Sequence, residues 1–452
     1  MLYNAFNILL NAGPTVMLPL IIFVIGLIFG VKPAKAFRSG LTVGIGFAGI
    51  KLVINLLSSN LGPAAQDMVK NFGIRLDALD VGWGSIAAVT WSSPIIAILI
   101  FVILAINIVM LILKVTNTLD VDIWNYHHMA IVGIMTYFVT NNVILGVLAT
   151  ITMAVVTFKM SDWTEHLVSD YFELPGVSLP TVSALSSLVI AAPLNMLLDK
   201  VPGINKVNFS VKDAKKYLGF FGEPMIMGLI LGGIIGALAK YDITKILGIA
   251  VNMAAVMVLI PKMTSLFMEG LMPISEAAKK FTKAKFKGRK FLIGLDAAVV
   301  VGNPEVITTS LIVIPLTIAL AVVLPGNRVL PFADLAVVPF RVALVVALTR
   351  GNLFKNIIMG LVCTGAILLA GTSTAPVMTE LAKSSGLDLS MAAGALISSF
   401  AATSLTLSFI VYKVFTGNLI VTIPIFLVGF IATWIYIEVI KKKKDAKEVV
   451  AE

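Results

Sequence analysis

The chain has few of the residues on which soluble folds and enzyme sites usually depend. Only 13% of its 452 residues are charged, and it contains three histidines and one cysteine. An ordinary soluble protein is about 25% charged. The single Cys363 cannot form an internal disulfide or a multi-cysteine metal site, so we interpret it as a small apolar core residue.

Several motifs that define enzyme classes are also absent. The sequence has no Gly-x-x-x-x-Gly-Lys-Ser/Thr phosphate loop, no serine-hydrolase elbow and no metal-ligand cluster. We therefore expect no ATPase, no cofactor and no metal. The net charge of +10 would suggest a nucleic-acid partner in a soluble protein. Here the basic residues form short clusters between apolar runs, which the positive-inside rule explains without nucleic acid.

Apolar residues are abundant instead, at 58% of the chain, with a mean hydropathy of +1.00. Several uncharged windows of roughly 17–25 residues are long enough to cross hydrocarbon as helices, and they lack the short alternation of a β-barrel. The predicted fold is an all-α polytopic membrane protein with about 11 transmembrane helices. The expected spans are 15–30, 41–57, 95–114, 126–141, 143–158, 224–239, 246–266, 305–324, 333–349, 353–370 and 418–440.

The basic clusters also predict an orientation. An odd number of crossings with an external N-terminus puts the clusters and the C-terminus in the cytoplasm. The loop 58–79, which carries Lys70 and Arg75, is then an external exception. We expect no cleaved signal peptide, because no basic region precedes the first apolar run. The clusters are Lys32 to Arg38, Lys206 to Lys216, Lys279 to Lys290 and Lys441 to Lys444.

Matching residues recur at a fixed offset and indicate an internal duplication. The pairs Pro14/Pro224, Pro63/Pro273, Pro94/Pro304 and Asn117/Asn327 are each 210 residues apart. We predict a first repeat at 1–205 and a second at 206–417, with 418–452 as an extra span and cytoplasmic tail. Each repeat holds about five crossings, so the halves must be inverted, as in many transporters. Scaffold and core domains would each draw on both repeats.

Two short apolar stretches occupy corresponding places in these repeats. The stretch 294–305 is too short to span a bilayer and is broken at Asn303-Pro304, and its counterpart 80–94 is broken by Gly and Pro. Such a pair is a pointer to a transporter site. We predict re-entrant hairpins here, and a second pair at 178–200 and 388–412.

The first stretch supplies three candidate substrate-binding residues. The carboxylate of Asp296 can accept hydrogen bonds from the hydroxyls of a polyol, or it can cap a broken helix. Glu305 follows Pro304 at a helix start, where a negative charge is favourable without any ligand. Asn303 can bind substrate or stabilise its own turn.

Other polar candidates lie near predicted span entrances. Glu223 precedes Pro224 and suits a helix start or a site. Asp122 lies close to His127 and His128, either of which can bind substrate, move a proton or serve the structure. Arg341 and Asp334 are seven residues apart, which on one helical face predicts an ion pair.

Aromatic and hydroxyl residues complete the candidates. Trp83 and Trp91 offer flat faces to the C–H bonds of a sugar, or they pack as membrane-interface anchors. Ser92 and Ser93 lie beside the break at Pro94 and suit either polyol contact or capping.

Several motifs together resemble a known family. They are Val121-Asp122-Ile123-Trp124-Asn125, Phe221-Gly222-Glu223-Pro224, Phe291 to Asp296 and Arg350-Gly351-Asn352-Leu353-Phe354. Nearly the whole chain is similar to the galactitol-type IIC subunits of the bacterial phosphoenolpyruvate-dependent sugar phosphotransferase system, which are related to the ascorbate-type permeases. The resemblance implies an inner-membrane permease that binds a sugar alcohol and presents it to a separate IIB subunit for phosphorylation.

The resemblance also implies partners and a transport mechanism. IIB carries a phosphocysteine and IIA a phosphohistidine, and the short tail leaves no room for either, so we expect both as separate chains. The ascorbate-type relatives imply a homodimer with an elevator motion, in which the first, second, sixth and seventh spans form the scaffold. The run Gly302-Asn303-Pro304-Glu305 departs from the galactitol pattern, which leaves the exact polyol or sugar open.

Two other functions fit the same residues. An ion-coupled secondary transporter would use Asp296 or Glu305 as a proton or sodium site. A non-transporting membrane receptor or scaffold would bind without flux and would not need matched hairpins.

Overall fold

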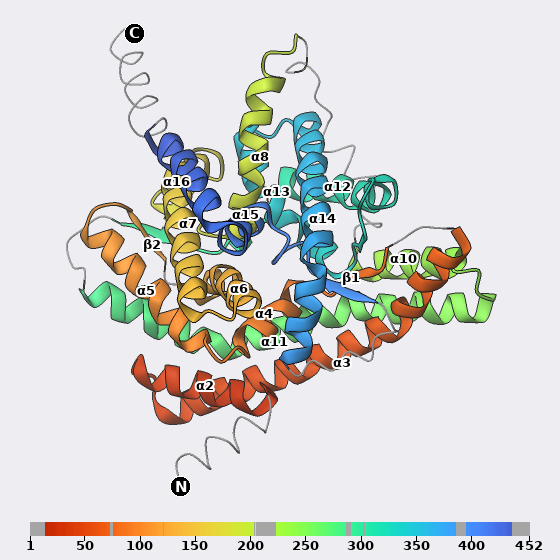
Figure 1. The fold of residues 1–452 in the computed structure, drawn as a ribbon, viewed down its shortest axis with the longest axis horizontal. Helices are drawn as coiled ribbons and strands as arrows, with labels where there is room; N and C mark the ends of the chain where they lie inside the picture. Colours follow the sequence, from red (N-terminus) through yellow and green to blue (C-terminus); the bar gives the residue numbers. More distant parts are fainter. Residues whose placement is uncertain are drawn as a thin grey trace.

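The computed structural model describes residues 14–72, 76–120, 122–202, 204, 223–285, 291–301, 303–385 and 395–435. This part of the chain is mostly helical (Figure 1). Within it, four helical stretches are long and apolar enough to cross a membrane. They become five if the bent pair α4 (Trp83–Trp91) and α5 (Ile96–Ile112) is one span. This agrees with the polytopic membrane class, while the number of eleven spans stays a prediction.

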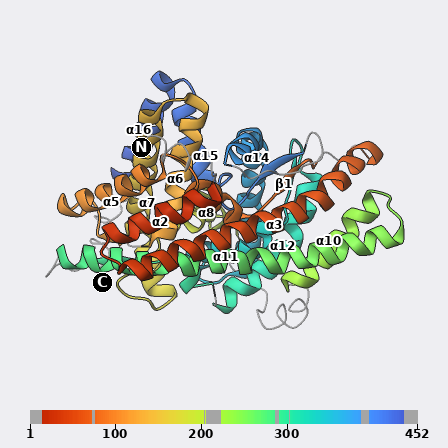
Figure 2. The same cartoon turned by 90° about the horizontal axis from the view of Figure 1, so that it is seen from below.

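Four helices pack together along one side of the molecule (Figures 1 and 2). Small residues allow close approach, because a Cβ at Gly228 would lie 2.5 Å from the Met253 carbonyl oxygen. Across the layer, the Asn252 amide donates a hydrogen bond of 2.9 Å to Asn60 Oδ1. We call these helices the flat layer: α2 (Pro14–Ile28), α3 (Pro33–Phe72), α10 (Pro224–Leu238) and α11 (Ile243–Lys285).

The loop predicted at 58–79 is wrong as far as Phe72, because α3 continues through it. Two of its polar residues find partners in the connection between α10 and α11: Asn71 donates to the Ala239 carbonyl at 3.0 Å, and Asp67 accepts from the Tyr241 hydroxyl at 2.7 Å. A hydropathy pattern detects the part of a helix that suits hydrocarbon, and misses a polar continuation. The basic clusters at 206–216 and 441–444, and the part of the cluster 279–290 that follows Lys285, lie outside the described residues.

Apart from α4 and α5, the remaining helices form a second group above the flat layer (Figure 1). Two of them begin at asparagines 210 residues apart: Asn142 accepts from the amides of Ile144 and Leu145, and Asn352 accepts from that of Lys355. The group contains α6 (Ile123–Thr140), α7 (Val143–Tyr171), α8 (Val182–Leu198), α12 (Pro304–Val323), α13 (Val338–Leu348), α14 (Leu353–Ser384), α15 (Thr406–Thr416) and α16 (Leu419–Ile435).

Two small parallel sheets were not expected from the sequence. In one, β1 (Ala78–Asp80) lies between β5 (Val329–Leu330) and β6 (Leu396–Ser398). In the other, β4 (Leu292–Gly294) lies between β2 (Thr118–Asp120) and β3 (Val177–Ser178). Each central strand thus comes from one half of the chain and both its neighbours from the other half. The all-α expectation missed them because strands of two or three residues have no readable periodicity.

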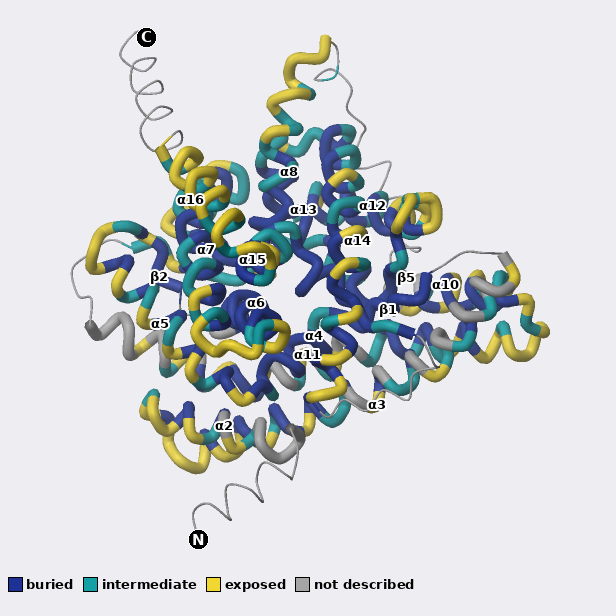
Figure 3. The backbone as a smooth tube through the Cα atoms, in the orientation of Figure 1, coloured by how far each residue is buried: buried dark blue, intermediate teal, exposed yellow. Residues whose placement is uncertain are grey.

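Figure 3 shows much of the buried chain in the middle of the molecule, near α6, α13 and β1, and one large hydrophobic cluster contains most of the buried apolar residues. They include Trp91, Phe332 and Phe400, and Cys363 is also buried, as expected. In contrast, none of the described residues of α16 is buried, and its apolar side chains such as Ile420 are exposed. An apolar helix with an exposed surface suits contact with lipid.

Candidate functional site

The end of β2 positions the start of α6. The buried Asp120 accepts hydrogen bonds on Oδ1 from the Asp122 amide (3.1 Å) and the Asn125 side chain (3.2 Å). Asp122 in turn accepts from the Trp124 amide at 3.1 Å and caps α6. These contacts fix the first turn of the helix that carries His127 and His128.

The end of β4 places Asp296 against the same turn. Asp296 Oδ1 accepts from the Ala298 amide at 2.8 Å and caps the 3-10 turn η3 (Ala297–Val299). Its Oδ2 lies 3.3 Å from the hydroxyl of Thr181, which also accepts from the Ala297 amide at 2.8 Å and lies 3.2 Å from Asn125 Oδ1. Thr181 therefore joins the β4 turn, the start of α6 and the start of α8. Its single proton can serve either Asn125 or Asp296, which leaves Asp296 acceptor capacity for a ligand.

The other sheet uses two buried carboxylates to fix its own loops. Asp80 Oδ2 accepts from the amides of Phe332 (2.9 Å) and Asp334 (2.8 Å). Asp334 accepts from the Trp83 amide (2.6 Å) and the Ala401 amide (2.9 Å). These hydrogen bonds position Trp83 at the start of α4 and Ala401 beyond β6.

A partly open pocket lies where these turns meet, and its empty space, which includes open solvent, is about 530 Å³. Of the described residues that line it, none is a lysine or an arginine. The lining residues are Trp83, Trp124, His127, His128, Thr181, Ser183, Asp296, Ala298, Val337, Phe340 and Ala401.

Aromatic rings form one wall of the pocket. The indoles of Trp83 and Trp124 meet edge to face, with centroids 5.9 Å apart, and the His127 ring lies 5.7 Å from Trp83. The two histidine rings are 3.8 Å apart. His127 Nδ1 lies 2.7 Å from the Trp124 carbonyl oxygen, and His128 Nε2 lies 3.3 Å from that of Ala401.

The structure brings four of the predicted site residues together and leaves others outside. Asp296, Trp83, His127 and His128 line the pocket, and Asp122 lies behind it as the cap of α6. The others of the first hairpin do not line it: Trp91 is fully buried in the core, Ser92 donates to the Val89 carbonyl, and Ser93 is buried at the 100° bend between α4 and α5.

The remaining candidates lie at helix starts. Asn303 caps α12 by accepting from the amides of Glu305 (3.0 Å) and Val306 (3.2 Å). Glu305 lies half-buried in the first turn of α12, beside Tyr171. Glu223 is exposed at the start of α10. None of the three lines the pocket.

Some pocket residues were not singled out from the sequence. Thr181, Ser183 and Ala401 fall in the segments 178–200 and 388–412, which the sequence marked as a second matched pair. That pair was the available signal for them. Val337 and Phe340, at the start of α13, gave no comparable signal.

The expected ion pair between Asp334 and Arg341 does not form. Asp334 lies in the 3-10 turn η4 (Ala333–Val337) and Arg341 in α13, so a spacing of seven residues does not put them on one helical face. The Arg341 guanidinium is buried, lies 4.6 Å from the centre of the Phe400 ring, and donates from Nη1 to Thr364 at 3.5 Å.

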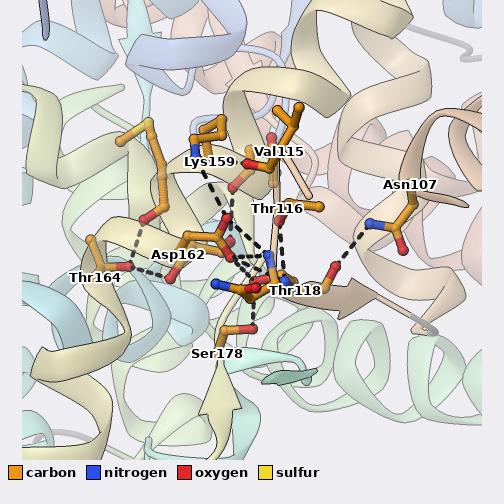
Figure 4. Close-up of polar contacts among 12 residues, drawn as sticks. Asn107, Val115, Thr116, Thr118, Lys159, Asp162, Thr164 and Ser178 are labelled. Atoms are coloured by element: carbon orange, nitrogen blue, oxygen red, sulfur yellow. Dashed lines mark hydrogen bonds and ion pairs between the residues drawn. The ribbon is translucent and has the colours of Figure 1, made fainter. Parts of the chain in front are cut away.

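A buried polar network supports β2 from α7 (Figure 4). The ammonium group of Lys159 donates to the Val115 carbonyl at 2.8 Å and lies 3.8 Å from Asp162. Asp162 accepts from the Thr118 amide (3.0 Å) and hydroxyl (2.9 Å), and Thr118 reaches Ser178 of β3 at 3.0 Å. The network therefore holds β2 and β3 together. The residues that follow these two strands lead to the pocket.

Comparisons with known proteins agree on one family. Residues 7–394 match the EIIC-GAT family model, described as PTS system sugar-specific permease component. The chain is 38% identical over 430 residues to the PTS system galactitol-specific EIIC component of Escherichia coli strain K12, covering 94% of this chain and 95% of the relative. It is also 38% identical over 381 residues to a putative permease IIC component of the same strain, covering 84% and 87%.

Proposed function

This chain belongs to the EIIC-GAT family of sugar-specific permease components of the phosphotransferase system, and on that premise we propose that its pocket binds a sugar alcohol. The protein is an integral protein of the inner membrane and works with IIB and IIA components. It carries the bound polyol across the membrane, and the phosphoryl group comes from the separate IIB chain. Its own contribution is to hold the acceptor hydroxyl in place for the transfer.

One observation supports this ligand class most strongly: the pocket combines Asp296 with an aromatic wall and has no lining lysine or arginine among its described residues. A carboxylate can accept hydrogen bonds from the hydroxyls of a neutral polyol. The faces of Trp83 and Phe340 suit the C–H surface of the same molecule. An anionic ligand would find no lining lysine or arginine to pair with.

The substrate we propose is galactitol or a closely related polyol. The relative that is 38% identical over nearly the whole chain is described as galactitol-specific. The departure at Asn303 and Glu305 does not argue against it, because neither residue lines the pocket. That departure lies at the start of α12, where Asn303 acts as a cap.

Calorimetry on the purified full chain with galactitol tests the proposal. Asp296→Asn should weaken galactitol binding by about 10- to 150-fold while the protein stays folded, because a hydrogen bond to a charged acceptor contributes about 1.5–3 kcal/mol. Glu380→Gln is the matched control, since it also neutralises a carboxylate, but one in an exposed pair with Lys383. Unchanged affinity in Asp296→Asn would remove Asp296 from the site.

Ion-coupled transport is the alternative that this test does not address. Uptake into membrane vesicles separates the two mechanisms. We expect galactitol to accumulate as its phosphate, and only when IIA, IIB and a phosphoryl donor are supplied. Accumulation of unmodified galactitol driven by a proton or sodium gradient alone would contradict the proposal.

We propose an elevator-type homodimer in which the flat layer is the scaffold. The close packing of α3 with α11 and of α10 with α11 supports a rigid scaffold, and the pocket belongs to the other helix group together with α4. The orientation with the N-terminus outside and the C-terminus in the cytoplasm is proposed from the basic clusters. The reciprocal exchange of strands between the sheets supports an inverted repeat of 1–205 and 206–417.

A further inference from the structure

We propose that His127 is held as the tautomer with its proton on Nδ1, and that its Nε2 accepts a hydrogen bond from a hydroxyl of the ligand. This inference rests on the proposed function, because it names a residue that reads the hydroxyls of a sugar alcohol. It assigns His127 as a specificity-determining binding residue.

The tautomer follows from the partner of Nδ1. His127 Nδ1 lies 2.7 Å from the Trp124 carbonyl oxygen, which is a short hydrogen bond within the first turns of α6. A carbonyl oxygen can only accept, so Nδ1 carries the proton and donates it. In a neutral imidazole the second nitrogen then has a free lone pair, so Nε2 is an acceptor.

That acceptor is buried and has no hydrogen-bond partner among the described residues. The side chain of His127 is 1% exposed and lies among Trp83, Trp124 and His128, and it lines the pocket. A buried polar atom without a hydrogen bond is costly and needs an explanation in a native structure. A donor supplied by the ligand satisfies it.

The chemistry of the donor follows from the rest of the lining. Asp296 and His127 Nε2 are both acceptors, and the described lining residues include no lysine or arginine. A ligand that satisfies both acceptors must bring hydroxyl protons to two places, as a neutral polyol does. A sugar acid or sugar phosphate offers acceptor oxygens and negative charge instead, and is disfavoured beside Asp296.

The first experiment measures the tautomer directly. The full chain, labelled with ¹⁵N in its imidazole rings, gives a simple NMR spectrum because it has three histidines: His127, His128 and His166. His166→Gln and His128→Gln assign the signals. We expect His127 to show the pattern of the Nδ1-protonated ring without any ligand. A pattern with the proton on Nε2 would overturn the inference.

The second experiment measures the hydrogen bond to the ligand. His127→Asn keeps an N–H donor near the place of Nδ1 and removes Nε2, so the contact with Trp124 can persist while the acceptor is lost. We expect the affinity for galactitol to fall about tenfold. His166→Asn, on an exposed part of α7, is the matched control and should bind as the unaltered chain does.

A series of monodeoxy galactitols identifies the hydroxyl and does not depend on a variant that folds. One member should bind the unaltered chain about tenfold more weakly than galactitol, and His127→Asn should lose that discrimination. The inference is overturned if the unaltered chain binds galactitol and every deoxy analogue with affinities within twofold of each other, and His127→Asn binds galactitol with the same affinity. His127 is then not the acceptor. If the unaltered chain binds no sugar alcohol at all, the proposed function itself fails.

Discussion

At the scale of single residues, the chain uses the same chemical group for two purposes. Asp80 and Asp334 accept several hydrogen bonds from the backbone and serve the loops around them. Asp296 caps a turn as well, and it also lines the pocket. The sequence could not separate these purposes, because an aspartate at a chain break suits a cap and a site equally. Burial and neighbouring elements decide between them.

The two tryptophans of the first hairpin make this distinction testable. Trp83→Phe should weaken galactitol binding about fivefold, or by ~1 kcal/mol, because a smaller ring covers less of the ligand. Trp91→Phe is the same substitution at a fully buried core position. It should lower the melting temperature through a cavity and leave the affinity unchanged. Calorimetry and thermal unfolding in detergent check both, and a reversed pattern would contradict the placement of the pocket.

At the scale of elements, the sequence located breaks better than it located ends. The glycine and proline positions near 80–94 predicted an interrupted segment, and the structure has a bend of 100° there. Hydropathy predicted a span at 41–57, which is the middle of α3, and missed both its start at Pro33 and its continuation to Phe72. The six strands were missed, because each consists of two or three residues whose pairing partners come from the opposite half of the chain. Such pairing is a property of the tertiary structure.

The network behind β2 predicts a stability effect at this scale. Lys159→Met should cost about 1–3 kcal/mol, because the Val115 carbonyl loses its donor and Asp162 loses a neighbouring cation inside the protein. Lys159→Arg keeps the charge and should recover much of the loss. Lys383→Met removes an exposed pair and should change little. The measurement is thermal unfolding of the purified chain; equal melting temperatures for Lys159→Met and the unaltered protein would contradict this role.

At the scale of the whole molecule, the duplication stays a prediction, but its 210-residue offset recurs in two hydrogen bonds. The Thr118 amide donates to Asp162 of α7, and the Arg328 amide donates to Thr372 of α14 at 2.9 Å. Each donor residue directly follows an asparagine of the matched set, Asn117 or Asn327. The acceptors, Asp162 and Thr372, are also 210 residues apart. The sequence could suggest the repeat from such matches. It could not show that each sheet combines strands from both halves.

Shared sheets predict that the two halves depend on each other. When 1–205 and 206–452 are expressed as separate chains in the same cells, we expect them to co-purify, because each half lacks partners for its own central strand. Each half expressed alone should be unstable in the membrane. Stable accumulation of either half by itself, measured by immunoblot and size-exclusion chromatography, would argue against the exchange of strands.

The central claim is that the sugar alcohol binds where the turns after the two sheets meet. The most direct test is an experimental structure of the full chain determined with galactitol. We predict density for the ligand between Trp83, His127 and Asp296, with a ligand hydroxyl within hydrogen-bond distance of His127 Nε2 and another near the Asp296 carboxylate. Density for galactitol at the start of α12, beside Asn303 and Glu305, with this pocket empty, would contradict the account.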